Sequence, residues 1–248
     1  MWGIIPAAGM GSRIQPLAFS KELLPVGCRL DGDIERPRAV SEYLIERMLL
    51  AGVDKIAFVI SPGKSDIIQY HGGRVAEAEL CYVVQPEPAG LCDALFRVAR
   101  LIPDEEEVVI GLPDTVWFPA DALTALPREG LSFLCFPVEK PELFDAVISD
   151  DDGRVREIQV KQRNAESRWV WGAFKLTGKI LRELSELWRQ REGRDAYVGT
   201  LVNAWLRDGG SARAVKAGNT YVDVGTLNGY REALKLLQGR TSETAVKQ

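Results

Sequence analysis

The stretch AAGMGSRIQPLAFSKELLPV (residues 7–26) places two glycines, an arginine and a lysine directly after a short apolar run. Glycines that follow the first strand of an open α/β sheet let backbone amides approach phosphate groups closely. Arg13 and Lys21 would add two positioned cations, which suit the several negative charges of a nucleoside triphosphate. The stretch therefore predicts a phosphate-binding loop that carries its own cations.

This loop fits neither of two common phosphate-binding motifs. A dinucleotide-binding fingerprint would need glycine at position 14, where the chain has Ile14. A P-loop needs Gly-Lys-Ser/Thr at the start of a helix, whereas Lys21 lies in a long segment that reaches Pro37 before the next predicted helix. We therefore expect a longer loop of a different kind.

The histidine and cysteine counts exclude several kinds of catalytic site. His71 is the only histidine, and it lies in IIQYHGG at a predicted helix end, where it would face the helix dipole. Relays that need histidine and His-rich metal sites are thereby disfavoured. The four cysteines have no C-x-x-C spacing, so we expect free, buried thiols in a reducing compartment.

Composition limits the partners of the protein. The 248 residues are 46% hydrophobic and 27% charged, as in ordinary soluble proteins, and the formal net charge is −4. There is no basic footprint for nucleic acid or an anionic membrane. No apolar run resembles a signal peptide or could span a bilayer, so we predict a cytoplasmic location. The sequence leaves the oligomeric state open, including a homo-oligomer.

The first half of the chain alternates short apolar runs with amphipathic ones, and this alternation positions the loop. Residues 2–7, 55–61, 78–85 and 106–113 have the Val/Ile content and length of strands, and 38–52, 64–73 and 90–102 have the apolar spacing of helices. Such alternation predicts an α/β fold with a Rossmann-like, mostly parallel mixed sheet that has helices on both faces.

The second half is more mixed. We expect a strand at 131–138, a hairpin over 146–161 that turns at DDDG, a strand at 169–177, helices at 179–191 and 199–209, extended structure at 211–225 and a helix at 228–238. No linker separates the two parts. We therefore predict one domain over 1–237, with a nucleotide-binding half (about 1–115) and a sugar-binding half (about 116–237), and a frayed polar tail at 238–248.

Several segments together resemble one family. G-x-G-[ST]-R-x-x-P-L followed by K-x-L-L-P-V is similar to the signature of the sugar-1-phosphate nucleotidylyltransferases, and most similar to the glucose-1-phosphate thymidylyl- and uridylyltransferases. The resemblance recurs in order along residues 2–235, in VVQPEPAGLCDAL, IGLPDTVW, REIQVKQ, WVWGAF and YVDVGT. It implies the nucleotide-diphospho-sugar transferase type of fold.

The resemblance implies roles for individual residues in nucleotide binding. The nucleotide would be bound by Ala8, Gly9, Gly11, Arg13, Lys21, Gln85 and Gly90. The Gln85 amide can offer a donor and an acceptor to a pyrimidine, in the order that uracil and thymine present. A flipped amide would serve cytosine, so the residue by itself does not fix the base.

The resemblance also implies the metal and sugar sites. Asp114 and Asp223, each after an extended apolar run, would hold Mg²⁺ against phosphate oxygens, since hard cations prefer oxygen ligands. Lys161 would bind the sugar phosphate, and Gly172 lies in the strand that resembles the sugar pocket. The catalytic residues would then be Arg13, Lys21, Asp114 and Lys161.

The chain departs from the family pattern mainly in its sugar-binding half. Val160 stands where the family has its sugar-reading carboxylate, Gln162 replaces the following proline, and Ala146 replaces a glycine. Thr115 stands where an Asn often follows the first metal-binding Asp, and the aromatic residue before the second Asp is Tyr221, where the family element has Trp. The identity of the sugar is therefore less well defined than the transfer reaction.

These features predict an enzyme that transfers a nucleotidyl group from dTTP or UTP to a sugar 1-phosphate and releases pyrophosphate. One alternative is a non-catalytic nucleotide-sugar binder or regulatory homologue, which the changes at Val160 and Ala146 would suit. Another is a glycosyltransferase, a class that often binds its metal through Asp-x-Asp. The only such run, at 150–152, lies in a predicted turn.

Overall fold

The computed structural model describes residues 1–245, with side chains described to residue 238. Its centre is a ten-stranded mixed sheet, in which the strands of the first half run parallel in the order β7-β1-β4-β6. These strands are β1 (Trp2–Pro6), β4 (Lys55–Ile60), β6 (Ala78–Val84) and β7 (Glu107–Gly111), and the short β5 (Arg74–Val75) pairs antiparallel with β6. Their carboxyl ends therefore share one edge of the sheet.

The second half extends the same sheet beyond β7. Its long strand β12 (Trp169–Thr177) pairs antiparallel with β7 and with β9 (Leu131–Pro137). The outer strands are β10 (Asp145–Ser149), β11 (Val155–Val160) and β13 (Ala212–Val215), where β10 and β11 form the predicted hairpin. No break in the hydrogen-bonded ladder separates the two halves along the path from β1 through β7 to β12.

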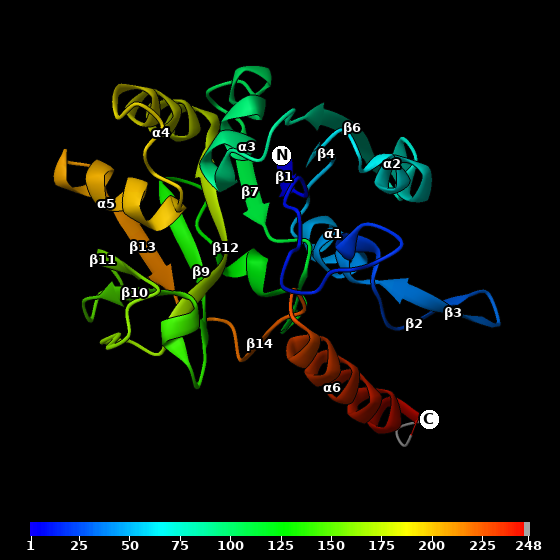
Figure 1. Cartoon of the computed structure of the whole chain (residues 1–248). Helices are drawn as coiled ribbons and strands as arrows, with labels where there is room; N and C mark the ends of the chain where they lie inside the picture. The colour runs from blue at the N-terminus through cyan, green and yellow to red at the C-terminus, as the bar shows by residue number, and fades with distance from the viewer. Residues whose placement is uncertain (246–248) are drawn as a thin grey trace.

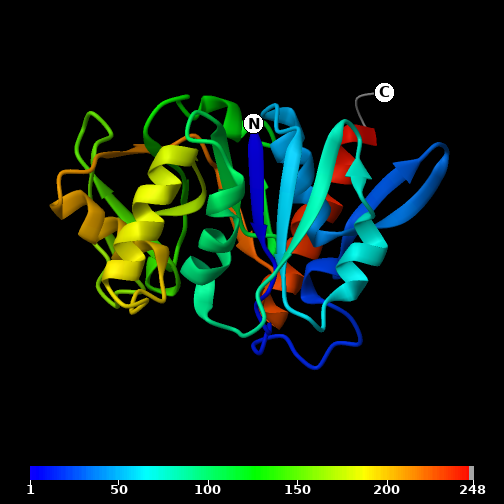
Figure 2. The ribbon, with the colours of Figure 1, turned by 90° about the horizontal axis from the view of Figure 1, so that it is seen from above.

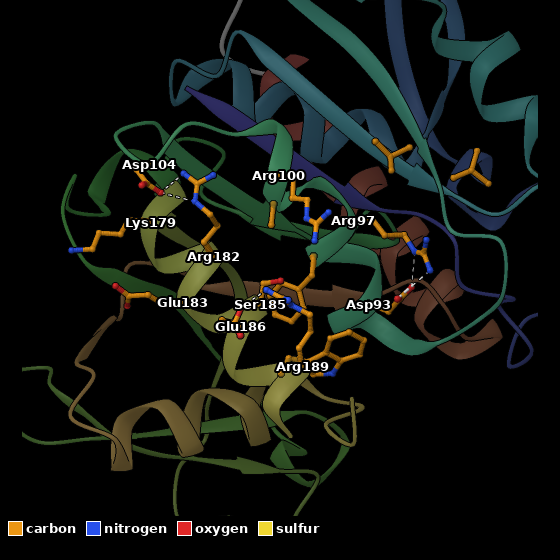
Figure 3. Close-up of a pocket in the computed structure, with 15 residues that line it drawn as sticks. Asp93, Arg97, Arg100, Asp104, Lys179, Arg182, Glu183, Ser185, Glu186 and Arg189 are labelled. Atoms are coloured by element: carbon orange, nitrogen blue, oxygen red, sulfur yellow. Dashed lines mark hydrogen bonds and ion pairs between the residues drawn. The ribbon is translucent and has the colours of Figure 1, made fainter. Parts of the chain in front are cut away.

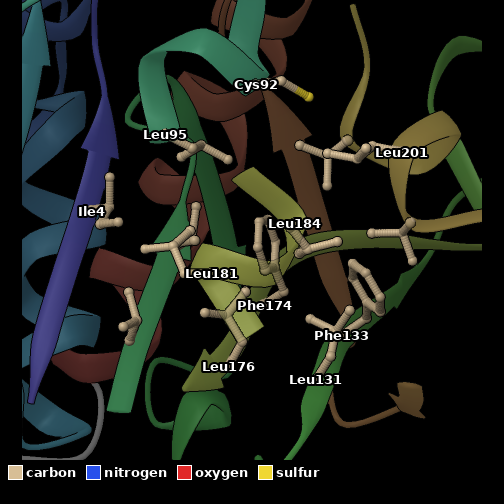
Figure 4. Packing of buried hydrophobic residues seen from close by; sticks show 14 of the residues in the cluster. Ile4, Cys92, Leu95, Leu131, Phe133, Phe174, Leu176, Leu181, Leu184 and Leu201 are labelled. Carbon is tan, nitrogen blue, oxygen red and sulfur yellow. The ribbon is translucent and has the colours of Figure 1, made fainter. Parts of the chain in front are cut away.

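Helices cover both faces of this sheet because consecutive side chains of a strand point to opposite faces. Ile4 belongs to a buried cluster that also includes residues of α3 (Gly90–Val98), α4 (Gly178–Gln190) and α5 (Val198–Arg207), part of which is drawn in Figure 4. Ile5 belongs to a second cluster, with residues of α1 (Val40–Leu50) and α2 (Ser65–His71). The two layers of helices on either side of β1 are visible in Figure 2. The predicted fold class is confirmed.

Two small sheets and a long helix complete the molecule. β8 (Thr115–Phe118) pairs with β14 (Thr220–Asp223), and β2 (Pro25–Asp31) pairs with β3 (Ile34–Ala39) as a hairpin that projects from the body in Figure 1. The backbone of α6 (Leu227–Ala245) continues far beyond the predicted end at residue 238. The predicted helix end at 238 is therefore too early, and residues 246–248 of the predicted tail lie outside the described residues. The remaining short helices are η1 (Lys21–Leu23), η2 (Ala99–Leu101), η3 (Ala122–Ala125) and η4 (Pro141–Leu143).

The hairpin β2–β3 and the strand β8 were absent from the predicted elements. In the hairpin, Leu30 and Ile34 are exposed, and Pro37 and several charged residues interrupt the alternation that marks a half-buried strand. β8 follows β7 after only three residues, so the two strands look like one apolar run in the sequence. Among the described residues, no helix is both long and apolar enough to cross a membrane.

The four cysteines are free thiols, as expected, but only two of them are fully buried, and the position of His71 differs from the expected one. Cys92 and Cys135 are buried, whereas Cys28 and Cys81 are half-buried, and all four are free thiols. His71 is the last residue of α2, but it lies inside the protein, stacked on Phe58 and hydrogen-bonded at 3.0 Å to the hydroxyl of Ser41. Burial lowers the pKa of His71 from 6.5 to about 4, so the imidazole is neutral rather than a cation at the helix end.

This buried histidine should make stability depend on pH between about 6.5 and 4. In that window the unfolded chain binds a proton that the native chain does not, so stability is full above 6.5 and falls as the pH approaches 4. We expect wild-type protein to lose about 2 kcal/mol more unfolding free energy than His71→Phe between pH 7 and pH 5. Urea titrations of both proteins measure this difference, and equal losses would contradict it.

Candidate active site

The glycine-rich loop leaves β1 at the carboxyl edge of the sheet and returns at η1. Gly11 has a φ of +65°, and an added Cβ there would lie 2.9 Å from the Lys21 side chain. The positive φ favours glycine at this position, and the missing side chain leaves room for Lys21 to pack closely against the loop. The structure therefore brings Gly11 and Lys21 together, as the predicted phosphate loop requires.

A buried ion pair that the sequence analysis missed holds this loop in place. Glu22 is fully buried, and both its carboxylate oxygens accept hydrogen bonds from Lys64 at 2.8 Å. Lys64 also donates to the carbonyl of Ala7 at 2.6 Å, which ties η1 to the end of β1. Burial raises the pKa of Glu22, and the charges of Lys64 and Lys21 oppose this shift. A lone acidic residue in an otherwise apolar run, KELLPV, was the available signal.

Lys21 forms a second ion pair, with Asp114. The Nζ–Oδ2 distance is 2.5 Å, and both side chains are largely buried. Burial alone would lower the pKa of Lys21, but the nearby carboxylates outweigh it and the net pKa is raised. Burial likewise opposes ionisation of Asp114, yet Lys21 holds its pKa below the ordinary value. Both groups are therefore charged at neutral pH.

Asp223 lies beside this pair because β14 pairs with β8. Asp223 is opposite Thr115 in the ladder, and Val224 donates its N–H to the carbonyl of Asp114 at 2.8 Å. Arg13 from the loop forms an ion pair with Asp223 at 3.0 Å. The structure thus brings together the two predicted cations and the two predicted metal ligands. These four residues come from three segments that are distant in the sequence.

The space beside Gly225 shows how closely these groups converge. A Cβ at Gly225 would lie 2.9 Å from Oδ1 of Asp223, 3.0 Å from Oδ2 of Asp114 and 3.1 Å from Nη2 of Arg13. A side chain at this position would crowd both carboxylates and the guanidinium of Arg13. Mg²⁺ is commonly bound by one or two protein carboxylates together with substrate phosphates and water. The donor set found here fits that ion.

A small cavity of about 180 Å³ opens next to the two aspartates. Lys161 lines it, and its Nζ lies 4.5 Å from the ring centre of Tyr197 and 3.4 Å from the Tyr197 hydroxyl. The backbone of Lys161 has a φ of +47°, which is costly for a residue with a side chain. Its N–H donates to the carbonyl of Phe144 at 2.9 Å. This strained turn aims the predicted phosphate-binding lysine at the cavity.

Asp145 also lines this cavity, and the sequence analysis missed it. It is the first residue of β10 and only 9% exposed. Burial raises its pKa, while the neighbouring Trp171 indole and the Lys161 charge act in the opposite direction. The available signal was an acidic residue at the start of an apolar strand, in LFDAVIS.

Gly172 does not line the cavity. A Cβ at Gly172 would lie 2.6 Å from the ring of Tyr221 and 2.7 Å from that of Phe136, so glycine is needed for these rings to pack. Tyr221 itself lines the cavity. Gly172 therefore acts through packing, and a contact with a sugar could come only from its backbone.

The residues predicted for base recognition lie farther along the same sheet edge. Ala8 is buried and Gly9 exposed directly after β1, while Gln85 follows β6 and is 3% exposed. The Gln85 amide nitrogen donates to the carbonyl of Gly90 at 3.1 Å and to Oδ2 of Asp93 at 2.7 Å. Gly90, at the start of α3, has a φ of +89°. Gln85 does not line the small cavity, so base and sugar would occupy separate places.

A larger groove, of about 780 Å³, lies between α3 and α4 and is shown in Figure 3. Most of its charges are engaged with one another: Arg97 pairs with Asp93, Arg182 with Asp104, and Arg189 with Glu186. None of the predicted site residues lines it. Its paired charges are those of a solvated surface, and the chemistry lies at the smaller cavity.

The run Asp150–Asp152 lies at the turn between β10 and β11, as predicted. Oδ1 of Asp150 accepts the backbone N–H of Arg154 at 2.8 Å, so this carboxylate closes the hairpin turn. The run is not among the residues of the candidate site. It therefore gives no support to a glycosyltransferase that binds metal through Asp-x-Asp.

The site combines a cationic loop, two convergent aspartates and a lysine-lined cavity at one edge of a Rossmann-like sheet. This arrangement is typical of enzymes that transfer phosphate-containing groups from nucleotides. The family model described as nucleotidyl transferase matches residues 2–239, and the chain belongs to that family. This confirms the family and the enzyme class predicted from the sequence.

Named relatives cover almost the whole chain. A glucose-1-phosphate thymidylyltransferase of Neisseria meningitidis is 25% identical over 96% of this chain and 83% of its own length. The UTP–glucose-1-phosphate uridylyltransferase AglF of Haloferax volcanii is 23% identical over 98% and 99%. The crystal structure of a Bacillus anthracis protein in complex with sucrose has the same fold, with a TM-score of 0.81, 22% identity, and coverage of 95% and 94%.

The backbone at Lys161 is strained, so a substitution that relieves the strain should not lower the stability of the protein even if it weakens ligand binding. Asparagine tolerates a positive φ better than lysine, so Lys161→Asn should leave the unfolding free energy unchanged or raise it by up to about 1 kcal/mol. The same change should weaken binding of a sugar 1-phosphate. Urea denaturation and calorimetric titration test the two effects. A destabilised variant would contradict the assignment of strain, and Lys140→Asn, on the exposed loop before η4, serves as control.

Proposed function

We propose that this protein transfers a nucleotidyl group from dTTP or UTP to a sugar 1-phosphate. The observation that carries the proposal is the meeting of Arg13, Lys21, Asp114 and Asp223 beside a small cavity lined by Lys161. Glucose 1-phosphate or a related sugar phosphate is the acceptor, as the names of the relatives suggest. A cytoplasmic location belongs to the same proposal.

The reaction needs no nucleophile from the protein. An oxygen of the sugar phosphate attacks the α-phosphorus of the triphosphate in line, and the bond to the β-phosphate oxygen breaks to release pyrophosphate. Catalysis is then a matter of positioning and of offsetting charge. Arg13 and Lys21 offset charge on the triphosphate and the leaving pyrophosphate, and Lys161 binds the acceptor phosphate. Asp114 and Asp223 would hold Mg²⁺, which supplies further charge neutralisation at the phosphates when bound.

A non-catalytic nucleotide-sugar binder is the alternative, and the changed sugar-binding half at Val160 and Ala146 motivates it. It would require neither two convergent carboxylates nor a strained lysine at the cavity. The retained set of four charged side chains supports the enzyme instead. Magnesium-dependent pyrophosphate release by the purified protein separates the two possibilities.

Arg13 offers the clearest mutational test of catalysis. It lies on the surface of the loop, with its side chain 62% exposed, so its removal should leave the fold intact. Losing one charge-stabilising contact in a transition state costs about 3 to 4 kcal/mol, which corresponds to at least a hundredfold in turnover. We therefore expect Arg13→Ala to release pyrophosphate at least a hundredfold more slowly. Arg163→Ala, at an exposed position before β12, is the matched control, and near-normal turnover by Arg13→Ala would refute the assignment.

The contacts of Gln85 support a choice of base that the sequence left open. Both acceptors around its amide, the Gly90 carbonyl and the Asp93 carboxylate, require the NH₂ group to point toward them. Arg97 fixes that carboxylate through hydrogen bonds of 2.7 and 3.1 Å. The amide oxygen is therefore the group offered to a base. It accepts from the N3–H of uracil or thymine, whereas N3 of cytosine is itself an acceptor.

This orientation predicts the order of triphosphates. We expect dTTP and UTP to be used within a few hundredfold of each other, because a methyl group changes affinity by only about 1 to 3 kcal/mol. CTP should be at least tenfold poorer than UTP, and ATP and GTP should be poor. Asp93→Asn would permit the Gln85 amide to flip and should narrow the UTP-to-CTP ratio. Values of kcat/KM for all five triphosphates test this, with Asp104→Asn, which also loses an ion pair to arginine, as control. A preference for CTP or a purine would overturn the role of Gln85.

A further inference from the structure

Asp145 is a buried carboxylate whose charge is only partly compensated by the protein. It is 9% exposed, and among the described residues no cationic nitrogen lies within ion-pairing distance of it. The Trp171 indole and, at longer range, Lys161 are the groups that favour its charge. Buried acidic groups are normally paired or hydrogen-bonded, because desolvation of an unpaired charge is costly. The carboxylate of Asp145 lines a cavity and is therefore available to accept hydrogen bonds from a ligand bound there.

The position of Asp145 identifies where that partner would bind. Asp145 lines the 180 Å³ cavity together with Lys161, Trp171, Tyr197 and Tyr221. The cavity thus has aromatic walls, two cations, Arg13 and Lys161, and one further carboxylate apart from the aspartates proposed for the metal. Small-molecule sites have this composition, with apolar walls and a few polar groups that fix orientation.

The chemistry of the carboxylate limits the kind of partner. An ionised carboxylate only accepts hydrogen bonds, so its ligand must donate them. Lys161 already places a positive charge in the same cavity, which disfavours a second cation. Neutral hydroxyl groups remain, and a carboxylate with two oxygens suits two adjacent hydroxyls of a sugar ring.

We propose that Asp145 determines sugar specificity, by accepting hydrogen bonds from hydroxyl groups of the acceptor sugar while Lys161 binds its phosphate. This inference rests on the proposed function, because it takes the cavity as the site of a sugar 1-phosphate. It assigns the recognition of the sugar to β10, whereas the family pattern has its sugar-reading carboxylate at the position of Val160, in β11.

The strand register offers a way to test this position directly. Asp145 lies opposite Val160 in the antiparallel ladder of β10 and β11, so the two side chains share one face of the sheet. A glutamate at position 160 would therefore project toward the same space as Asp145. If the cavity needs a carboxylate there, Val160→Glu should compensate for the loss of Asp145.

The test measures binding separately from turnover. Calorimetric titrations with glucose, mannose and galactose 1-phosphates, and with inorganic phosphate, would compare wild type, Asp145→Ala, Asp145→Asn and Asp145→Ala/Val160→Glu. Hydrogen bonds to charged groups correspond to about 10- to 150-fold in affinity. We expect Asp145→Ala to weaken the best sugar phosphate at least tenfold without weakening phosphate, Asp145→Asn to bind with intermediate affinity, and the double variant to recover part of the loss.

Monodeoxy analogues of the best sugar phosphate identify the hydroxyls concerned. An analogue that lacks the relevant hydroxyl should bind wild type at least tenfold more weakly, but Asp145→Ala no more weakly than the parent sugar. Removal of a poorly compensated buried charge should not unfold the protein, and Asp151→Ala, in the exposed hairpin turn, is the control.

Two outcomes overturn the proposal: unchanged sugar phosphate affinity in Asp145→Ala, or an equal loss for inorganic phosphate. Lack of binding of every sugar phosphate to wild type would also overturn it. Binding by wild type that depends on Asp145, without release of pyrophosphate from dTTP or UTP, would refute the proposed function and support the role of Asp145.

Discussion

The ion pair between Lys21 and Asp114 connects the parts on which the site depends. Lys21 comes from the glycine-rich loop that follows β1, and Asp114 from the segment that follows the neighbouring strand β7. Neither charge is favourable alone at this depth, since a buried ion without a partner costs several kcal/mol. The requirement to compensate these charges fixes the loop, and the fixed loop in turn brings Arg13 to Asp223.

A second layer of charge supports the first. Glu22 is adjacent to Lys21 in sequence, and its pairing with Lys64 attaches η1 to the segment before α2. Lys64 and Lys21 both lower the cost of burying Glu22, and Glu22 in turn favours the charged form of Lys21. Carboxylates thus hold in place the cationic side chains that would contact a triphosphate.

Much of the site could be predicted because its residues lie in short segments of strong local pattern. Arg13, Lys21, Asp114 and Asp223 each follow a strand or a loop of recognisable composition, and the structure brings these four together. Asp145 could not be found in this way, since its significance comes from the pairing of β10 with β11 and from burial, neither of which a local pattern encodes. The direction of the Gln85 amide depends on Asp93, one helical turn into α3, and needed coordinates for the same reason. The exposed hairpin β2–β3 was missed because its pairing buries little apolar surface.

The continuity of the sheet has a consequence for how the chain can be divided. β7 pairs with β1 on one side and with β12 on the other, so it belongs to both halves at once. A fragment that ended near residue 115 would leave Val108–Ile110 as an uncovered edge strand of apolar residues, and such edges promote aggregation. The two halves are therefore separate in the ligands they are expected to bind but share one hydrogen-bonded sheet. Exchange of the sugar-binding half between relatives would succeed only if the new β12 matched the register of β7.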